Sequence, residues 1–263
     1  MRKSPGDRIP ADSFFAGGPS AKEDYTVGKR IRFVGKFSES FANGKVLDVG
    51  CGYGAYLEFL LSASTHVFAI DINPDFLNGI HGKNISKKLF LSRMDAQQIA
   101  FSSGAFTAVV ALEVLEHIPQ DVEFLRHVFR VLKPGGILLL SVPNRLFPME
   151  THPIRYKSRL VGSRWGTGIP LLPWLPSWIR RRFATVRLYS TWELISLLKR
   201  TGFTVKETAW LMPNLDSLEQ KTPGLRMKAR IFRLVRRTLE ILEKSPLRNF
   251  GSTILICAEK PFL

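Results

Sequence analysis

The stretch Val46-Leu47-Asp48-Val49-Gly50-Cys51-Gly52-Tyr53-Gly54 decides the fold of this chain. A short apolar strand at 45–49 runs into three glycines, and a helical pattern follows at 55–62. Glycine lets the backbone turn tightly and approach a ligand without a clash from Cβ. The free N–H groups and the positive dipole end of the following helix favour an anionic group there. The stretch therefore predicts a nucleotide-binding strand–turn–helix unit.

Apolar runs and helical patterns alternate through the rest of the chain. Further strands are predicted at 66–70, 88–92, 106–112, 137–142, 203–211 and 251–259, and helices at 74–80, 121–132, 190–200 and 223–244. The helix at 121–132 should end at Lys133-Pro134-Gly135-Gly136, and Ser190 and Glu193 form the pattern of a capping box. Strands that alternate with helices predict a doubly wound α/β fold whose parallel strands end at one ligand-binding edge.

Asp71 closes the second predicted strand, so it should lie at this edge beside the glycine turn. A carboxylate at that place can accept hydrogen bonds from both hydroxyls of a ribose. The alternative is a helix N-cap ahead of Pro74. The glycine spacing also departs from the G-x-G-x-x-G pattern of dinucleotide enzymes, which argues against a nicotinamide-dependent oxidoreductase.

Five segments, in this order, resemble the motifs of class I S-adenosylmethionine-dependent methyltransferases. They are 46–54, 69–73, 93–96, 109–113 and 132–136, and the likeness covers roughly residues 40 to 145. It points to the ubiquinone-type branch, which includes the methyltransferase-11 and -23 groups. The resemblance implies a Rossmann-like, seven-stranded, mostly parallel sheet with its last strand antiparallel, and it implies a methyltransferase that uses S-adenosyl-L-methionine.

The resemblance also implies roles for individual residues. Asp48 and the turn would hold the methionine part of the cofactor, Asp71 the ribose, and Asp95 the adenine amino group. The whole implied cofactor set is Asp48, Gly50, Cys51, Gly52, Gly54, Asp71, Ile72, Asp95, Ala96 and Glu113. Asp95 has the alternative of an ordinary loop acid. Cys51 is expected to be a small filler and not a nucleophile.

Glu113, Glu116 and His117 follow the fourth predicted strand and would share one face if the stretch is helical. Two carboxylates and an imidazole suit proton transfer, with Glu116 and His117 catalytic, or a divalent cation such as Mg²⁺. The pattern resembles the ubiquinone-type O-methyltransferases and the small-RNA 3′-terminal 2′-O-methyltransferases, where His152 would add a ligand. Metal-free methyltransferases carry a similar stretch, in which Glu113 caps the cofactor site and His117 is structural. Asn144 and Arg145 either face the acceptor or form a turn.

The net charge of +16 lies almost entirely after residue 144. Residues 145–188 mix Pro, Trp and Arg with a single acid, and we interpret them as an irregular insertion, a lid over the acceptor, within one domain at 25–263. Trp, Leu and Arg together suit the surface of an anionic membrane. So does an amphipathic helix at 223–244, unless its apolar stripe packs on the sheet. A solvated basic surface is the simpler alternative.

We expect residues 1–24 to form a loose tail, because prolines and glycines interrupt them. We also expect neither a signal peptide nor a membrane-spanning helix, since no sufficiently long apolar run is present. Two cysteines form no disulfide framework, which favours a reducing, cytoplasmic location, with the membrane surface as an extension of it. We expect O-methylation of a lipid-like or small phenolic acceptor. The alternatives are an RNA 2′-O-methyltransferase, although no RNA-binding motif is present, and a non-catalytic cofactor-binding or membrane-associated module. The oligomeric state is not predicted.

Overall fold

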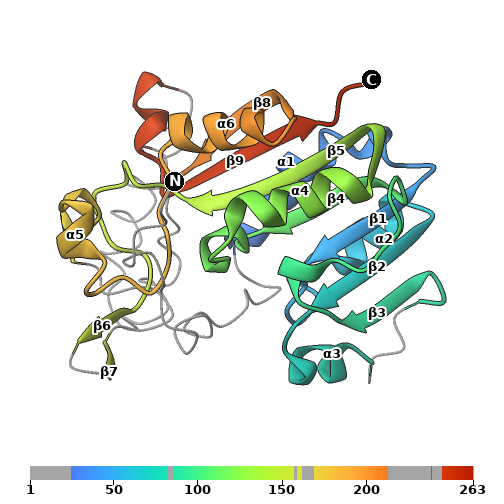
Figure 1. The fold of residues 1–263 in the computed structure, drawn as a ribbon, viewed down its shortest axis with the longest axis horizontal. Helices are drawn as coiled ribbons and strands as arrows, with labels where there is room; N and C mark the ends of the chain where they lie inside the picture. The colour runs from blue at the N-terminus through green and yellow to red at the C-terminus, as the bar shows by residue number, and fades with distance from the viewer. Residues whose placement is uncertain are drawn as a thin grey trace, which may run out of the picture.

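A seven-stranded sheet forms the centre of the protein (Figure 1). The computed structural model describes residues 25–81, 86–156, 159–161, 169–212, 238 and 245–262. The strand order is β3-β2-β1-β4-β5-β9-β8. The strands are β1 (Lys45–Val49), β2 (His66–Asp71), β3 (Leu89–Arg93), β4 (Phe106–Leu112), β5 (Leu132–Pro143), β8 (Thr204–Leu211) and β9 (Thr253–Glu259).

The predicted topology is confirmed. The strands β3, β2, β1, β4 and β5 pair in parallel, and β9 is antiparallel to both β5 and β8. The first strand lies between β2 and β4, with Val46 opposite Val67 on one side and Ala108 on the other. Central parallel strands are covered on both faces, which is why their sequences are apolar runs and not alternating patterns.

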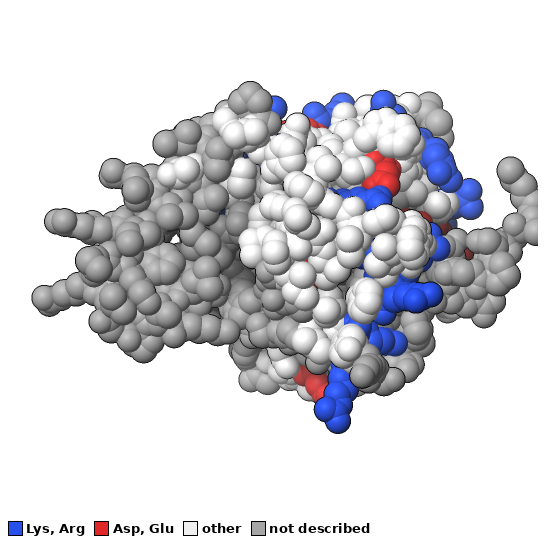
Figure 2. All heavy atoms as spheres, turned by 90° about the vertical axis from the view of Figure 1, so that its left-hand side faces the viewer, with Lys and Arg blue, Asp and Glu red and all other residues white. Residues whose placement is uncertain are grey.

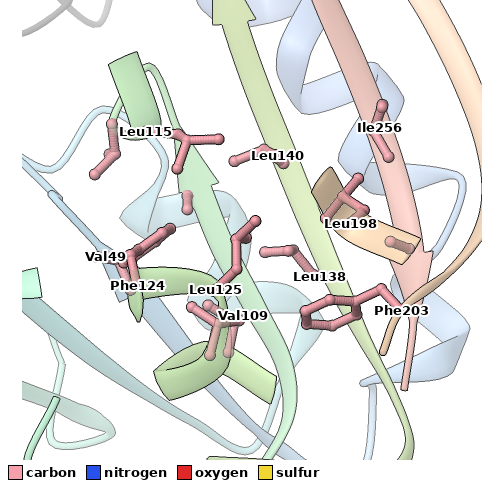
Figure 3. Packing of buried hydrophobic residues seen from close by; sticks show 14 of the residues in the cluster. Val49, Val109, Leu115, Phe124, Leu125, Leu138, Leu140, Leu198, Phe203 and Ile256 are labelled. Atoms are coloured by element: carbon pink, nitrogen blue, oxygen red, sulfur yellow. The ribbon is translucent and has the colours of Figure 1, made fainter. Parts of the chain in front are cut away.

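Helices cover both faces of the sheet (Figure 1). On one face α4 (Asp121–Val131) and α6 (Thr191–Arg200) join β4, β5 and β9 in one buried cluster, and Figure 3 shows Leu125 of α4 and Leu198 of α6 on either side of Leu138. On the other face a second buried cluster joins side chains of α1 (Tyr25–Gly35), α2 (Leu57–Ala63) and α3 (Pro74–His81) to β1 and β2. Burial of each large apolar side chain contributes about 1.5–3 kcal/mol. The two clusters hold the strand ends, and thus the site, in place.

Most predicted boundaries agree with the structure to within two residues, and the start of β5 differs by more. Helix α2 begins at Leu57 and not at residue 55, because the glycine turn continues through Tyr56. Strand β5 begins at Leu132, five residues earlier than predicted. Helix α4 does end before Lys133, but Gly135, with φ 75°, lies in the extended chain and not in a helix cap. The predicted capping box of Ser190 and Glu193 is confirmed.

The insertion after β5 has more regular structure than the sequence indicated. It contains the hairpin of β6 (Ile154–Tyr156) and β7 (Arg159–Val161), a 3₁₀ turn at Leu172–Trp174 and the short helix α5 (Ser177–Arg180). Its two halves are joined by bridges between Met149 and Pro170 and between Ile154 and Ala184. The interpretation of 145–188 as wholly irregular is therefore wrong, because backbone pairing between distant segments supplies the order.

Two predictions concern residues outside those that the structure describes. They are the loose tail at 1–24 and the amphipathic helix at 223–244, of which residue 238 alone is described. Among the described helices, none combines the length and the apolar character required to span a bilayer.

Candidate active site

The glycine turn adopts backbone angles that other residues rarely take. Gly50, Gly52 and Gly54 have φ of 67°, 53° and 79°. A Cβ on Gly50 would lie 2.6 Å from Cγ2 of Val114, and one on Gly54 would lie 2.7 Å from Cδ1 of Leu57. The turn therefore needs glycine both for its conformation and for its close packing. The contact with Val114 also places the turn directly beside the residues that follow β4.

Asp71 holds the turn from the end of β2. Its Oδ2 accepts a hydrogen bond from the backbone N–H of Gly52 at 2.9 Å, and its Oδ1 accepts one from Asn73 at 2.9 Å. Asn73, and not Asp71, accepts from the N–H of Asp75 in the first turn of α3. Each carboxylate oxygen keeps a further lone pair. Asp71 can thus fix the turn and still accept hydrogen bonds from a ligand.

Asp48 precedes the glycine turn, and burial of its carboxylate charge is energetically unfavourable. Its side chain is buried, and its Oδ2 has no hydrogen-bond partner among the described residues. Burial, together with the charge of Asp71, raises the pKa of Asp48 to about 8. A cationic ligand would remove this penalty, and S-adenosylmethionine carries an ammonium and a sulfonium group. Burial also raises the pKa of the neighbouring Cys51 thiol, which agrees with a filler and not a nucleophile.

The predicted adenine residues lie at the ends of β2 and β3. Oδ1 of Asp95 accepts from the N–H of Gln97 at 2.8 Å, so Asp95 caps the 3₁₀ turn Ala96–Gln98 and keeps its second oxygen for a ligand. The N–H of Met94 donates to the carbonyl of Asp71 at 3.1 Å, which joins this segment to the glycine turn. Ile72 is exposed at the same edge. The three aspartates, Asp48, Asp71 and Asp95, and the glycines thus lie at the same end of the sheet.

The helical condition under which Glu113, Glu116 and His117 would share one face is not met. The φ of Glu113 is 58°, and only Leu115–His117 form a 3₁₀ turn. The N–H of Glu113 donates to the carbonyl and to Oγ of Ser141, and that hydroxyl donates to Oε1 of Glu113 at 2.9 Å. A left-handed non-glycine residue costs about 1–3 kcal/mol and is often found at functional sites. In this conformation the Glu113 side chain contacts Ser141 of β5.

Arg30 of α1 is a site residue that the sequence reasoning missed. Its Nη2 lies 3.1 Å from Oε1 of Glu113, and its Nη1 lies 3.4 Å from the hydroxyl of Tyr56. The guanidinium is buried, so the ion pair is largely shielded from water. A signal was present in the sequence, because Arg30 falls between Val27 and Val34 at helical spacing on the buried face of α1.

Glu116 is the most constrained acid of the site. It is 1% exposed, and neither carboxylate oxygen has a hydrogen-bond partner among the described residues. Burial, and next the charge of Glu113, raise the pKa of Glu116 well above its usual value. Ligand atoms of Glu113, Glu116 and His152 all lie within 4.8 Å of one another. This cluster, the Glu113–Glu116–His152 cluster, has the donor types and spacing of a divalent-cation site.

The cluster contains His152 in place of the predicted His117. Nε2 of His117 lies 3.9 Å from Oε1 of Glu116, and its buried Nδ1 has no partner among the described residues. Because the chain reverses at Glu113 instead of continuing as a helix, the insertion can bring His152 to the acids. Burial lowers the pKa of His117, and it lowers that of His152 to about 4. Both imidazoles are therefore neutral near pH 7, the form that accepts a proton or binds a metal.

Asn144 and Arg145 serve the structure rather than the acceptor. The Asn144 amide donates to the carbonyls of Asn249 and Gly251, at 2.8 and 2.6 Å, and its Oδ1 accepts from the N–H of Leu146. Arg145 pairs with Glu193 of α6 at 3.1 Å. The turn alternative therefore describes these two residues.

The fold is that of S-adenosylmethionine-dependent methyltransferases. A family model described as a methyltransferase domain matches residues 22–208, and the chain belongs to that family. A crystal structure of an S-adenosylmethionine-dependent methyltransferase from Mesorhizobium loti superposes with a TM-score of 0.59 at 15% identity, over 91% of this chain and all of that one. The [4+2]-cyclase SpnF is also similar, with a TM-score of 0.58 at 19% identity, over 94% of this chain and 88% of that one.

Curated relatives match about half of the chain. A ubiquinone biosynthesis O-methyltransferase of Xanthomonas oryzae is 37% identical over 126 residues, which are 46% of this chain and 53% of that protein. The corresponding protein of Xanthomonas axonopodis is 35% identical over 138 residues, 50% of this chain and 57% of its own length. The chain thus spans about half the length of the curated relatives it matches.

Proposed function

We propose that this protein transfers the methyl group of S-adenosylmethionine to an oxygen of a lipid-like or small phenolic acceptor. One observation carries the proposal. The contact of Gly50 with Val114 places the glycine turn, with Asp48 and Asp71, directly beside the Glu113–Glu116–His152 cluster. The candidate cofactor residues and a cluster of two acids and one imidazole thus lie at the same edge of the sheet, which supports the proposal. The O-methyltransferase relatives support oxygen as the acceptor atom.

The chain's own residues supply the positioning that methyl transfer needs. S-adenosylmethionine, when bound, supplies a methyl group already activated on sulfur. Asp71 and Asp95 would orient its ribose and adenine by accepting hydrogen bonds, and ionised Asp48 would pair with its positive charge. Fixing donor and acceptor in line converts a bimolecular reaction into an effectively unimolecular one, which is the main source of rate in such a site.

An acceptor hydroxyl must also lose its proton. The Glu113–Glu116–His152 cluster would hold a divalent cation, because a cation would compensate the buried charge of Glu116 and offset the repulsion between the two acids. Such an ion lowers the pKa of a bound hydroxyl. His117, neutral and beside Glu116, would then accept the proton. Arg30 would keep Glu113 in position.

Calorimetric titration with S-adenosylmethionine and with its demethylated product tests the cofactor site. Wild type should bind both, and Asp71→Ala should bind neither tightly. Transfer of labelled methyl to a polyprenyl catechol then tests the acceptor class, with a small catechol and a single-stranded RNA as competitors. Absence of heat with either cofactor form would overturn the proposal. Binding without transfer to any acceptor would support a non-catalytic module, and transfer to RNA would support the RNA alternative.

The cation site is tested separately by thermal unfolding with Mg²⁺ or Mn²⁺. Binding at saturating concentrations should raise the melting temperature by several degrees, because a ligand that binds only the native state stabilises it. Glu116→Gln should lose this shift. Glu123→Gln, an exposed acid in the first turn of α4, should keep it. If neither cation raises the melting temperature of the wild type, the cation site is refuted, and proton transfer would rest on His117 and Glu116 alone.

A lipid-like acceptor would lie in a membrane. We therefore also propose that the protein is cytoplasmic and associates with the cytoplasmic surface of a membrane. The basic charge of the insertion supports this location, because anionic headgroups attract Lys and Arg. Cell fractionation would test it. Recovery of the active protein wholly apart from membranes at low ionic strength would count against it.

A further inference from the structure

The insertion presents exposed apolar side chains from three separate segments. Leu171, Trp174 and Trp178 are 54%, 51% and 69% exposed, and Leu146 and Met149 are exposed as well. We name these five residues the aromatic surface. A folded protein usually buries such side chains, and a group of them on the outside marks a place of contact.

Backbone contacts bring the members of the aromatic surface together. The N–H of Leu171 donates to the carbonyl of Pro148, and Met149 forms a bridge with Pro170. The indole N–H of Trp174 donates to the carbonyl of Leu146 at 3.2 Å, which satisfies its polar atom while the ring stays exposed. Trp178 follows four residues after Trp174, in the short helix α5. The aromatic surface is therefore a built feature and not a set of loose side chains.

Positive charge borders the aromatic surface. Arg181 and Arg182 are exposed directly after α5. The one acid between residues 145 and 188, Glu150, is buried. Figure 2 shows this side of the molecule, with a broad area of uncharged atoms and Lys and Arg along part of its margin. An apolar centre with a basic margin and no exposed acid in the insertion is complementary to a layer of phosphate groups over hydrocarbon.

We infer that the aromatic surface docks on an anionic lipid bilayer, with Trp174 and Trp178 at headgroup depth and Arg181 and Arg182 against lipid phosphates. Tryptophan favours this depth because its ring is apolar and its N–H is polar. Aliphatic side chains such as Leu171 are stabilised when they leave water for the hydrocarbon of a bilayer. RNA is the less suitable partner, because its bases would stack only on the tryptophan rings. The inference deepens the proposed function and rests on it for the lipid acceptor.

Docking in this orientation would also bring the acceptor site to the bilayer. Met149 lies three residues before His152, and the N–H of His152 donates to Glu150 at 3.1 Å. The segment that carries the aromatic surface thus continues directly into the Glu113–Glu116–His152 cluster. An acceptor anchored in the membrane could reach this cluster without leaving its lipid environment completely.

Flotation of the full chain with vesicles tests the inference. Wild type should float with phosphatidylcholine vesicles that contain phosphatidylglycerol, bind pure phosphatidylcholine weakly, and dissociate as salt rises, since exposed charges are screened. Trp174→Ala with Trp178→Ala, and separately Arg181→Glu with Arg182→Glu, should each weaken binding about tenfold or more.

Two matched controls lie at the opposite end of the sheet. Lys87→Glu with Lys88→Glu makes the same change in charge at exposed residues before β3, and Phe90→Ala removes an exposed aromatic ring from β3. Both should float like wild type. Cofactor calorimetry on every variant shows whether it is folded, and it separates this test from that of the proposed function.

Flotation of the tryptophan and arginine variants at wild-type levels would overturn the inference. So would an equal loss in the two controls, which would indicate a diffuse charge effect. Binding to a single-stranded oligonucleotide in place of vesicles, lost in the same variants, would assign the aromatic surface to RNA instead. Flotation without any cofactor binding would leave the docking inference standing and remove the methyltransferase proposal.

Discussion

Replacing Asp71 by Asn tests the centre of the proposed cofactor site with almost no change in volume. In the wild type both carboxylate oxygens accept backbone hydrogen bonds at 2.9 Å, one from Gly52 and one from Asn73. The amide has one oxygen, so its NH₂ group must face one of these two donors. A buried donor left without an acceptor costs about 1–3 kcal/mol. The free energy of unfolding should fall by that amount.

The effect on cofactor affinity follows from the same geometry. The remaining lone pairs of the carboxylate would accept the two ribose hydroxyls, and a hydrogen bond to a charged group contributes about 1.5–3 kcal/mol. Asp71→Asn keeps one acceptor but loses the charge and the second acceptor. The dissociation constant for S-adenosylmethionine should therefore rise about 10- to 150-fold, because 1.4 kcal/mol is a factor of ten.

Calorimetry measures the affinity and urea denaturation measures the stability. Asp75→Asn is the matched control, since this carboxyl group is exposed in the first turn of α3 four residues further on. It should change neither quantity appreciably. An Asp71→Asn protein that binds the cofactor within about twofold of wild type would refute the reasoning, whatever its stability, since a single lost bond to the charged carboxylate already corresponds to more than tenfold.

Three further predictions follow from the site and its turn. Gly54→Ala should destabilise the protein by about 3 kcal/mol in urea denaturation, because φ is 79° and the added methyl group would lie 2.7 Å from Cδ1 of Leu57. Gly104→Ala is the control: with φ 64° and open space around it, it should cost only about 1–2 kcal/mol. Equal losses of stability would contradict the packing argument. Cofactor binding near pH 7 should release a proton and strengthen as pH rises towards about 8, because a cationic ligand favours ionised Asp48 over its protonated form. Calorimetry in buffers of different ionisation enthalpy detects the released proton. Asp48→Asn should abolish this proton release. The His152 imidazole has a folded pKa of about 4, below its unfolded value of 6.5, so its contribution to stability is present above about pH 6.5 and declines as pH falls towards 4. The difference in unfolding free energy between wild type and His152→Asn should therefore shrink over that pH range. A constant difference would show that burial does not shift the pKa of His152.

The sequence by itself determined the sheet and the position of the candidate cofactor residues on it. Local patterns were sufficient there. Apolar runs marked the parallel strands, the glycines marked a turn whose φ values other residues rarely adopt, and Asp71 was found because parallel strands end at a common edge. Each of these signals depends on neighbours in the chain or on topology, so each could be predicted without knowing any tertiary contact.

Only the tertiary structure decided the acceptor half. Local spacing suggested a helix through Glu113 and a metal set that included His117, but the bond from Ser141 holds Glu113 in a left-handed turn and the insertion supplies His152 instead. Arg30 joins the site from a helix far away in sequence. The aromatic surface likewise exists because backbone bridges bring distant segments together. Contacts between residues far apart in the chain leave no periodic pattern, which is why sequence reasoning missed Arg30 and could not assign the partners of Glu113.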